Sequence, residues 1–213
     1  MSKISELKAK INSIPEEYKQ IIDLRISEFS SFNQKTNEDW FSELCFCLLT
    51  ANSKAQTAIN IQKTLGYDGF TKLSQENLAR TIREHKHRFH NNKAKYIIQA
   101  RQNKNIKEII QSIVKKENEF KAREWLVQNI NGLGYKEASH FLRNTGHKSL
   151  AILDRHILNI LADNNIIEKP KSLNKKIYLD NEKIFQNLAS SLETTPAKLD
   201  LQLWYLQTGR VLK

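Results

Sequence analysis

A lysine and an aspartate stand at the starts of two successive segments, and their types and spacing suit nucleophilic chemistry. Lys136 follows the turn Asn131–Gly134, and Asp154 lies 18 residues later in an apolar run. A lysine held partly neutral is a competent amine nucleophile, and a nearby carboxylate can take up its proton. Taken singly, each residue is more often a solvated lysine or a helix-capping aspartate, so the pair needs support from the surrounding sequence.

The turn before Lys136 is able to bind a phosphate. Gly132 and Gly134 flank Leu133, which permits a sharp hairpin between two helices with the leucine buried. The glycine N–H groups would then face solvent at the positive end of the next helix, where they could hold a phosphate without reading base sequence. A plain helix–helix turn is an equally good interpretation of Gly-Leu-Gly alone.

The elements that must position these residues are predicted to be helices throughout. Apolar residues recur at helical spacing, only 6 Gly and 3 Pro interrupt 213 residues, and no alternating run predicts a strand. The fold class is therefore all-α. The segment 66–69 is expected to be a turn, and 85–93 and 168–179 to be basic loops. The expected helices are two within 4–30 that meet at Pro15, then 37–49, 55–65, 73–83, 94–101, 106–114, 120–130, 135–145, 150–162, 181–192 and 196–207.

The charge balance favours a polyanionic partner. Lys and Arg number 34 against 23 Asp and Glu, which gives a formal net charge of +11. Such an excess favours nucleic acid, although a generally lysine-rich composition would also produce it. Cys45 and Cys47 are expected to be buried free thiols, since two cysteines cannot ligate an iron–sulfur cluster. No apolar segment resembles a signal peptide or a membrane span, so we expect a soluble, cytoplasmic, nucleoid-associated monomer.

With these features in place, the sequence resembles the helix-hairpin-helix DNA glycosylase superfamily, and within it the archaeal-type (compact) 8-oxoguanine DNA glycosylase/AP lyase family. The resemblance implies one glycosylase unit over residues 1–213, which can divide into two helical halves flanking a DNA-binding cleft. The sequence departs from the wider superfamily at Ala151-Ile152-Leu153, where Gly-Pro or Pro-Val often precedes the aspartate. The segments that carry the resemblance are ELCFCLLTANSKA, RFHNNKAKYI, NGLGYKEASHFLRNTG, LDRHIL and WYLQTGRVLK.

The resemblance implies a role for each residue of the pair. Lys136 would attack the anomeric carbon, displace 8-oxoguanine and form a Schiff base, from which β-elimination nicks the strand 3′ to the abasic site. Asp154 would help to deprotonate the lysine and would stabilise the oxocarbenium-like sugar. The implied partner is double-stranded DNA containing an oxidised base, and the implied chemistry needs no cofactor and no metal.

Base recognition is implied near the C-terminus. Trp204 falls where the family places an aromatic residue against the flipped base, and Lys213 falls where the family's C-terminal lysine contacts 8-oxoguanine. A terminal carboxylate can accept a hydrogen bond from the N7–H that 8-oxoguanine has and guanine lacks. The alternatives are that Trp204 belongs to the core and that Lys213 is a frayed end.

The gap left by a flipped base also needs a filler. Phe89 in the basic loop is one candidate, and Asn52 and Ser53 after the helix at 37–49 are two others; each is equally well read as an ordinary loop or core residue. The histidines of the basic loop are interpreted as a phosphate-facing surface, since no acidic or thiol ligands accompany them to form a metal site. These histidines are His85, His87 and His90.

Two other functions stay open at this point. The same lyase chemistry could act on a different oxidised base, such as a pyrimidine, although the ending Val211–Lys213 favours 8-oxoguanine through the family resemblance. A non-catalytic helix-hairpin-helix module would use the hairpin only to bind DNA. A covalent Schiff base with Lys136 distinguishes the enzymes from the module.

Overall fold

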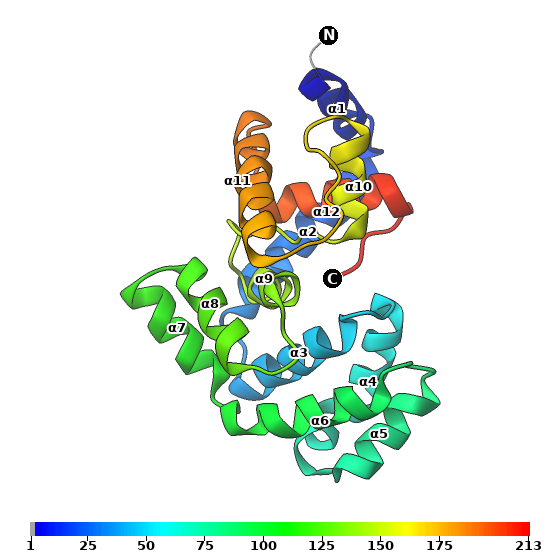
Figure 1. Ribbon diagram of the computed structural model, residues 1–213, viewed down its shortest axis with the longest axis vertical. Helices are drawn as coiled ribbons and strands as arrows, with labels where there is room; N and C mark the ends of the chain where they lie inside the picture. The colour runs from blue at the N-terminus through cyan, green and yellow to red at the C-terminus, as the bar shows by residue number, and fades with distance from the viewer. Residues whose placement is uncertain (1–2) are drawn as a thin grey trace. The chain divides into compact units, whose positions relative to one another are not determined.

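The structure is a computed structural model that describes residues 3–213, and within that range all regular secondary structure is helical (Figure 1). It contains the α-helices α1 to α12 and one short 3-10 helix, η1. The predicted all-α class is confirmed. The chain forms two compact units, which we call the central unit (residues 34–141) and the terminal unit (the residues up to 33 together with 142–213).

The central unit is built around α3 (Asn37–Thr50), whose residues from Trp40 to Thr50 are buried except for Ser42. This burial on all sides agrees with its nearly all-apolar sequence. Thr36 starts the helix in a reciprocal capping box with Asp39. Of the other helices, α4, α6 and α7 pack against α3. The remaining elements of this unit are α4 (Ala55–Lys72), α5 (Gln75–Glu84), α6 (His90–Ala100), η1 (Arg101–Asn103), α7 (Ile106–Lys116), α8 (Glu119–Asn129) and most of α9 (Tyr135–Asn144).

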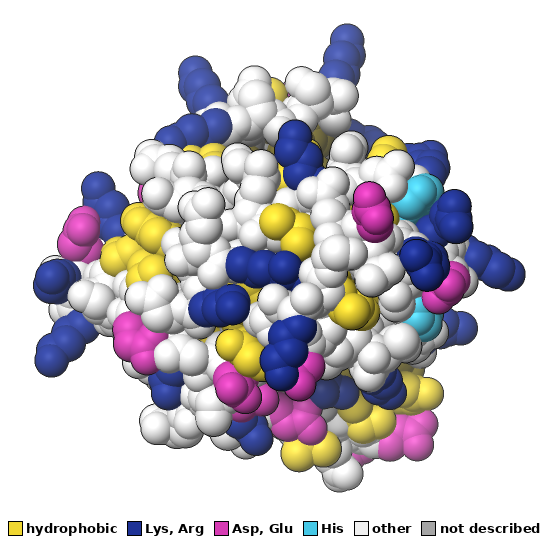
Figure 2. Space-filling model, turned by 90° about the horizontal axis from the view of Figure 1, so that it is seen from below, with side chains coloured by type: hydrophobic (Ala, Val, Ile, Leu, Met, Phe, Trp, Pro, Cys, Tyr) yellow, Lys and Arg dark blue, Asp and Glu magenta, His cyan; other side chains and the backbone are white. Residues whose placement is uncertain are grey.

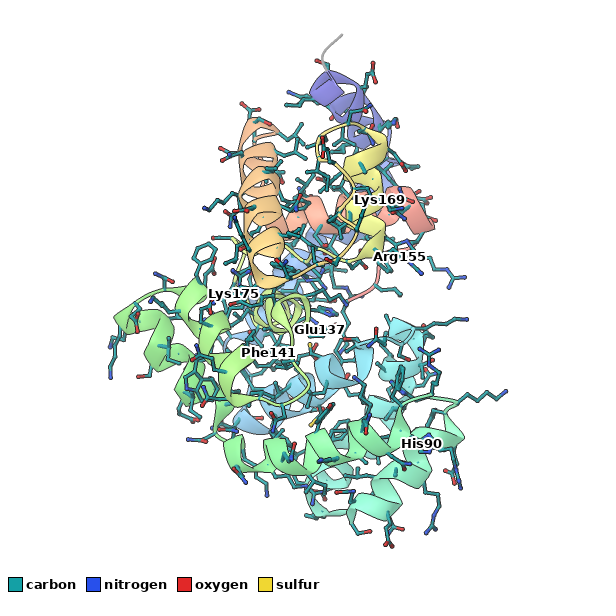
Figure 3. The ribbon with its side chains drawn as sticks, in the orientation of Figure 1. His90, Glu137, Phe141, Arg155, Lys169 and Lys175 are labelled. Carbon is teal, nitrogen blue, oxygen red and sulfur yellow. The ribbon has the colours of Figure 1, made fainter. Side chains whose placement is uncertain are left out.

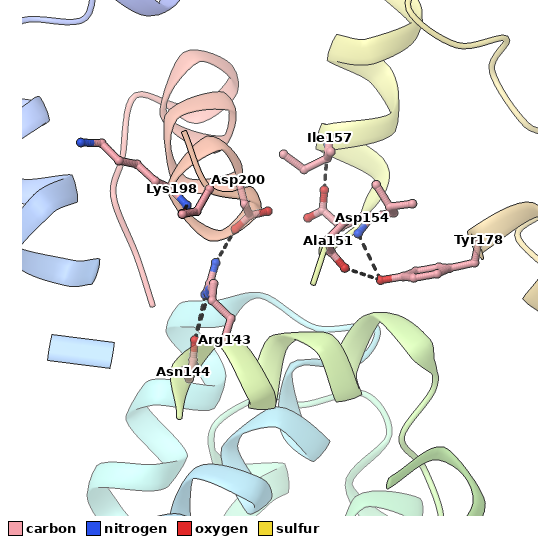
Figure 4. A network of polar contacts seen from close by, with 10 residues as sticks. Arg143, Asn144, Ala151, Asp154, Ile157, Tyr178, Lys198 and Asp200 are labelled. Carbon is pink, nitrogen blue, oxygen red and sulfur yellow. Dashed lines mark hydrogen bonds and ion pairs between the residues drawn. The ribbon is translucent and has the colours of Figure 1, made fainter. Parts of the chain in front are cut away.

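The terminal unit is built around α12 (Pro196–Thr208). Helices α1 (Lys3–Asn12), α2 (Glu16–Phe32), α10 (Arg155–Asp163) and α11 (Lys175–Ser191) all pack against it. Arg143, in the last turn of α9, forms a buried ion pair with Asp200 of α12 and also bonds the side chain of Asn144 (Figure 4). Because Asp200 stands one helical turn before Trp204, this network fixes the part of α12 that carries the tryptophan.

Three expected boundaries outside the segment around Asp154 were wrong, and burial of an apolar or aromatic side chain explains two of them. In the predicted turn 66–69 only Gly66 leaves the helical region (φ 56°, ψ −171°), so α4 continues through a kink to bury Phe70. Helix α6 begins at His90, inside the expected basic loop. Helix α11 begins at Lys175, where Asn174 accepts a hydrogen bond from the Ile177 N–H, because Tyr178 is buried. None of the helices in residues 3–213 is long and apolar enough to cross a membrane.

Candidate active site

The hairpin between α8 and α9 has the geometry of a phosphate-binding turn. Gly132 adopts a positive φ of 91°, and the Leu133 side chain is buried, as predicted. Gly132 and Gly134 are both exposed, and neither N–H has an acceptor among residues 3–213. Two free N–H groups beside the start of a helix provide the donors that a phosphate oxygen requires.

Replacing Gly132 by alanine should destabilise the central unit. A Cβ atom at this position would lie 2.4 Å from the ring of Tyr96, and an L-residue is strained at this φ. At Gly134 the nearest atom to an added Cβ is a terminal oxygen of the Glu137 side chain, at 3.4 Å, which is an ordinary contact distance. We therefore expect G132A to lower the free energy of unfolding by about 2 kcal/mol and G134A to stay near wild type in urea titrations. Equal losses in the two variants would contradict this account.

Lys136 lies in the first turn of α9, on a rigidly held segment. The hydroxyl of the preceding residue, Tyr135, donates to Glu124 at 2.7 Å, and the guanidinium of the buried Arg123 lies 5.2 Å from the centre of the Tyr135 ring. The Lys136 side chain is 25% exposed, and its Nζ stands 3.7 Å from Oε1 of Glu137. The amine is therefore accessible but held close to one carboxylate.

The segment that carries Phe89 is attached to the end of α3 through His87. The Phe89 N–H donates to His87 Nδ1 (3.2 Å), so the ring proton lies on Nε2, which bonds the Leu49 carbonyl (2.9 Å). Burial lowers the pKa of His87, which favours this neutral form. The phosphate-facing role predicted for His87 is wrong, because its side chain is only 2% exposed and bonds the protein instead.

The three candidate gap fillers are held at the same end of α3. Phe89 lies two residues after His87, and Asn52 and Ser53 lie just beyond Leu49, the residue to which His87 is bonded. Asn52 is exposed with a positive φ of 59°, in a turn closed by the Ser53 N–H and the Thr50 carbonyl (3.1 Å). Phe89 is half-buried beneath the Arg88 guanidinium, 4.4 Å from its ring centre.

Asp154 caps α10, which begins at Arg155 and not at Leu150 as expected. Its Oδ1 accepts from the N–H groups of His156 (2.8 Å) and Ile157 (2.9 Å), whereas its Oδ2 has no hydrogen-bond partner among residues 3–213 (Figure 4). One carboxylate oxygen therefore fixes the helix, and the other is left for an external group.

The apolar residues before Asp154 are buried but extended. Their backbone groups need partners, since they belong to no helix or sheet. Tyr178 of α11 donates its hydroxyl to the Ala151 carbonyl (2.7 Å), and Glu182 accepts from the Ala151 N–H (3.0 Å). These bonds explain why the predicted start of the helix was wrong: side chains of α11 satisfy the backbone in an extended form.

Trp204 and the C-terminal residues are ordered parts of the terminal unit. The Trp204 ring meets the His156 ring edge-on, with centroids 4.8 Å apart, and its side chain is only partly buried. His156 lies two residues after Asp154. The contact with His156 therefore places Trp204 in the same region of the terminal unit as Asp154. Val211 packs against the cluster of Ile22, Phe29 and Leu201, so the residues that lead to Lys213 are anchored.

The two units divide the predicted site residues between them. The hairpin, Lys136, Phe89, Asn52 and Ser53 belong to the central unit, while Asp154, Trp204 and Lys213 belong to the terminal unit. The sequence interpretation missed Lys93 and Glu137, which lie near Lys136. The spacing of Lys93 could have indicated its burial. It lies four residues before Ile97 and seven before Ala100, so the three residues share one face of α6.

The chain is similar in sequence to proteins of one known family. A family model described as 8-oxoguanine DNA glycosylase matches residues 22–194. The 8-oxoguanine DNA glycosylase/AP lyase of Methanocaldococcus jannaschii is 51% identical over 214 residues, which cover 100% of this chain and 99% of that protein.

Solved structures resemble this chain over its length. A crystal structure of the Methanocaldococcus jannaschii 8-oxoguanine glycosylase/lyase in complex with a 15-mer DNA containing 8-oxoguanine has a TM-score of 0.89 at 50% identity, with 99% of this chain and 98% of that chain covered. The 8-oxoguanine DNA glycosylase of Thermotoga maritima gives a TM-score of 0.90 at 42% identity, with 99% and 100% covered. The chain belongs to the 8-oxoguanine DNA glycosylase family.

Proposed function

We propose that this protein excises 8-oxoguanine from double-stranded DNA and then nicks the strand 3′ to the abasic site, with Lys136 as the nucleophile. The observation that carries the proposal is the match to 8-oxoguanine DNA glycosylase/AP lyases over essentially the full length of both chains. The hairpin–lysine segment of α9 supports it independently, because it places an accessible amine directly after two unpaired N–H groups. Activity on DNA would place the working enzyme at the nucleoid, in the cytoplasm.

The basic surface suits a DNA backbone. Lys and Arg side chains are spread over the face in Figure 2, with histidines among them toward its right edge. In the terminal unit, Arg155, Lys169 and Lys175 are all exposed and come from α10, the following loop and α11 (Figure 3). Together with the net charge of +11, this supports binding through phosphates, which is independent of base sequence.

The proposed reaction begins with the neutral Nζ of Lys136. It bonds to C1′ as the bond from C1′ to N9 breaks, and the base leaves. Opening of the sugar ring gives a Schiff base, and loss of a C2′ proton then expels the 3′ phosphate. Asp154 would act through Oδ2, since Oδ1 is engaged by two N–H groups, and its charge would stabilise the positive charge that develops on the sugar.

Base recognition is assigned to Trp204 and Lys213. The exposed part of the Trp204 ring would form an aromatic wall for the flipped base, while its edge contact with His156 fixes the ring orientation. The Lys213 carboxylate would accept the N7–H of 8-oxoguanine, and it would repel the N7 lone pair of guanine. In the central unit, Phe89, Asn52 and Ser53 are the residues proposed to fill the gap in the duplex.

Deleting Lys213 should reduce selectivity more than it reduces lyase activity. We expect excision of 8-oxoguanine to fall by about 10- to 100-fold, since one buried polar contact is lost, while nicking of a preformed abasic site changes less than threefold. Single-turnover kinetics on the two duplexes measure both values. Equal losses on the two substrates would remove Lys213 from base recognition.

A panel of duplexes tests the function as a whole. Wild-type protein is incubated with DNA containing 8-oxoguanine, an oxidised pyrimidine or an abasic site, with and without borohydride. We expect base release and a trapped adduct with 8-oxoguanine, and only slow release of the pyrimidine. Preferential release of the pyrimidine would change the substrate and keep the chemistry, whereas binding without any adduct would indicate a non-catalytic DNA-binding module.

A further inference from the structure

Lys93 is a buried lysine close to the proposed nucleophile. It lies on α6, its side chain is 4% exposed, and neighbours on the same helix face are the buried Ile97 and Ala100. Lysine is rarely this buried without a partner, because the ammonium group loses part of its hydration. Within residues 3–213, however, its ammonium group has no hydrogen bond and no ion pair within 4 Å. Core packing alone would be served better by methionine, so the charge needs an explanation.

The geometry places Lys93 beside the first turn of α9. Helix α6 packs along the hairpin: Asn131 donates to the Gln99 side chain at 3.2 Å, and the Tyr96 ring occupies the space that a side chain on Gly132 would need. Lys93 lies one helical turn before Tyr96, on the same face of α6. This register brings its ammonium group within electrostatic range of two charged residues of α9, Lys136 and Glu137.

Glu137 is therefore acted on by two lysines. Its carboxylate lies in the first turn of α9 (Figure 3), 3.7 Å from Nζ of Lys136, and its side chain is 15% exposed. The negative charge of Glu137 also attracts the Lys93 ammonium group, whereas the positive charge of Lys136 repels it. A carboxylate that paired with Lys136 alone would hold that residue as an ammonium ion, which cannot attack carbon.

We propose that Lys93 is a positioning residue for the reaction: its ammonium charge competes for the Glu137 carboxylate and leaves the nitrogen of Lys136 free to attack the sugar. The proposal rests on the nucleophilic role proposed above for Lys136. The unpaired state of Lys93 is then functional, since a tight ion pair with Glu137 would cancel the charge on which the effect depends.

The charge on Lys93 is itself sensitive to pH. Burial lowers the pKa of Lys93 to about 8, the Glu137 charge opposes this shift, and the Lys136 charge adds to it. His87, in the segment that leads into α6, also interacts electrostatically with Lys93, and His90 at the start of α6 lies close to His87. A group whose pKa is depressed in this way carries its charge below about pH 8 and loses it above. The effect of Lys93 should therefore be largest near pH 7 and fade above about pH 9.

Variants of Lys93 test the proposal in the full-length protein. The rate of borohydride trapping on abasic-site DNA is measured from pH 6 to pH 10. We expect Lys93→Met to slow trapping about tenfold at pH 7 and to move the pH of half-maximal rate upward by about one unit, which corresponds to tenfold in a proton equilibrium. Lys93→Arg keeps a permanent charge and should stay within about threefold of wild type at pH 7. Adding Glu137→Gln to Lys93→Met should restore most of the rate, because the competing carboxylate is gone.

Two controls separate this effect from folding and from the role of Lys136. Lys95→Met removes an exposed charge from the same helix and should leave the pH profile unchanged. A Lys93→Met profile that superimposes on wild type, or a slowed rate that Glu137→Gln does not restore, would overturn the proposal. If instead wild type forms no adduct, or Lys136→Gln traps as fast as wild type, the nucleophile assignment fails first.

Discussion

Replacing Lys136 by glutamine should abolish the covalent adduct with lesion DNA. Glutamine has no nucleophilic nitrogen, so neither displacement of the base by an amine nor a Schiff base can form. We expect the rate of strand nicking to fall by about 10³-fold or more, with DNA affinity changed less than about threefold. The affinity should persist because the free N–H groups of Gly132 and Gly134 belong to the backbone and do not depend on this side chain. Borohydride trapping and fluorescence anisotropy measure the two quantities.

The matched control for Lys136→Gln is Lys63→Gln, which removes one exposed positive charge from α4. It should trap at the wild-type rate and weaken DNA binding only slightly, in a salt-dependent manner. An adduct in Lys136→Gln at the wild-type rate would assign the nucleophile to another amine. Lys93 would then be the first to examine, because its lowered pKa of about 8 makes its neutral fraction at neutral pH larger than that of an ordinary lysine.

The helices that were predicted best are those in which the pattern of apolar residues matches the side chains that are buried. The run from Trp40 to Leu49 is apolar on all sides and forms the centre of its unit, and Pro196 begins α12 as its position at a first turn indicates. The burial of the leucine in Gly-Leu-Gly was also predicted correctly, since Leu133 is buried. In these places local sequence and tertiary structure favour the same answer.

The predictions failed where a side chain distant in sequence determines the backbone. Leu150–Leu153 is apolar enough for a buried helix, but Tyr178 and Glu182 of α11 bond its backbone in an extended form. His87 stands among basic residues, yet it is buried through a bond to Leu49, 38 residues earlier. Composition within a short window carries no information about such partners. Lys93 was missed for the same reason. The charges that act on it belong to Lys136 and Glu137 of α9, which are distant from it in sequence.

The cap of α10 shows that capping by Asp154 is compatible with the catalytic role proposed for it. Both N–H groups of the α10 cap bond the same oxygen, Oδ1, and Oδ2 has no partner among residues 3–213. Capping therefore orients the carboxylate and occupies only one of its two oxygens. The Trp204 ring contacts the His156 ring in the same unit, so the start of α10 holds both a carboxylate and an aromatic ring. A single residue can thus serve the fold with one oxygen and chemistry with the other.

Replacing Asp154 by asparagine should separate these two roles. The asparagine oxygen caps a helix about as well as aspartate, so the free energy of unfolding should change by less than about 0.5 kcal/mol. The negative charge is lost, however, and base release should fall by about 10²- to 10⁴-fold, because neither proton transfer from the lysine nor the charge on the sugar is supported. The matched control is Asn174→Ala, which removes the cap of α11 and should cost about 1 kcal/mol of stability while leaving base release within about twofold. Single-turnover excision and urea unfolding on the same samples give both numbers. If Asp154→Asn lost stability as Asn174→Ala does and kept its rate of base release, Asp154 would be a capping residue alone, and the charge that promotes the reaction would have to come from another carboxylate.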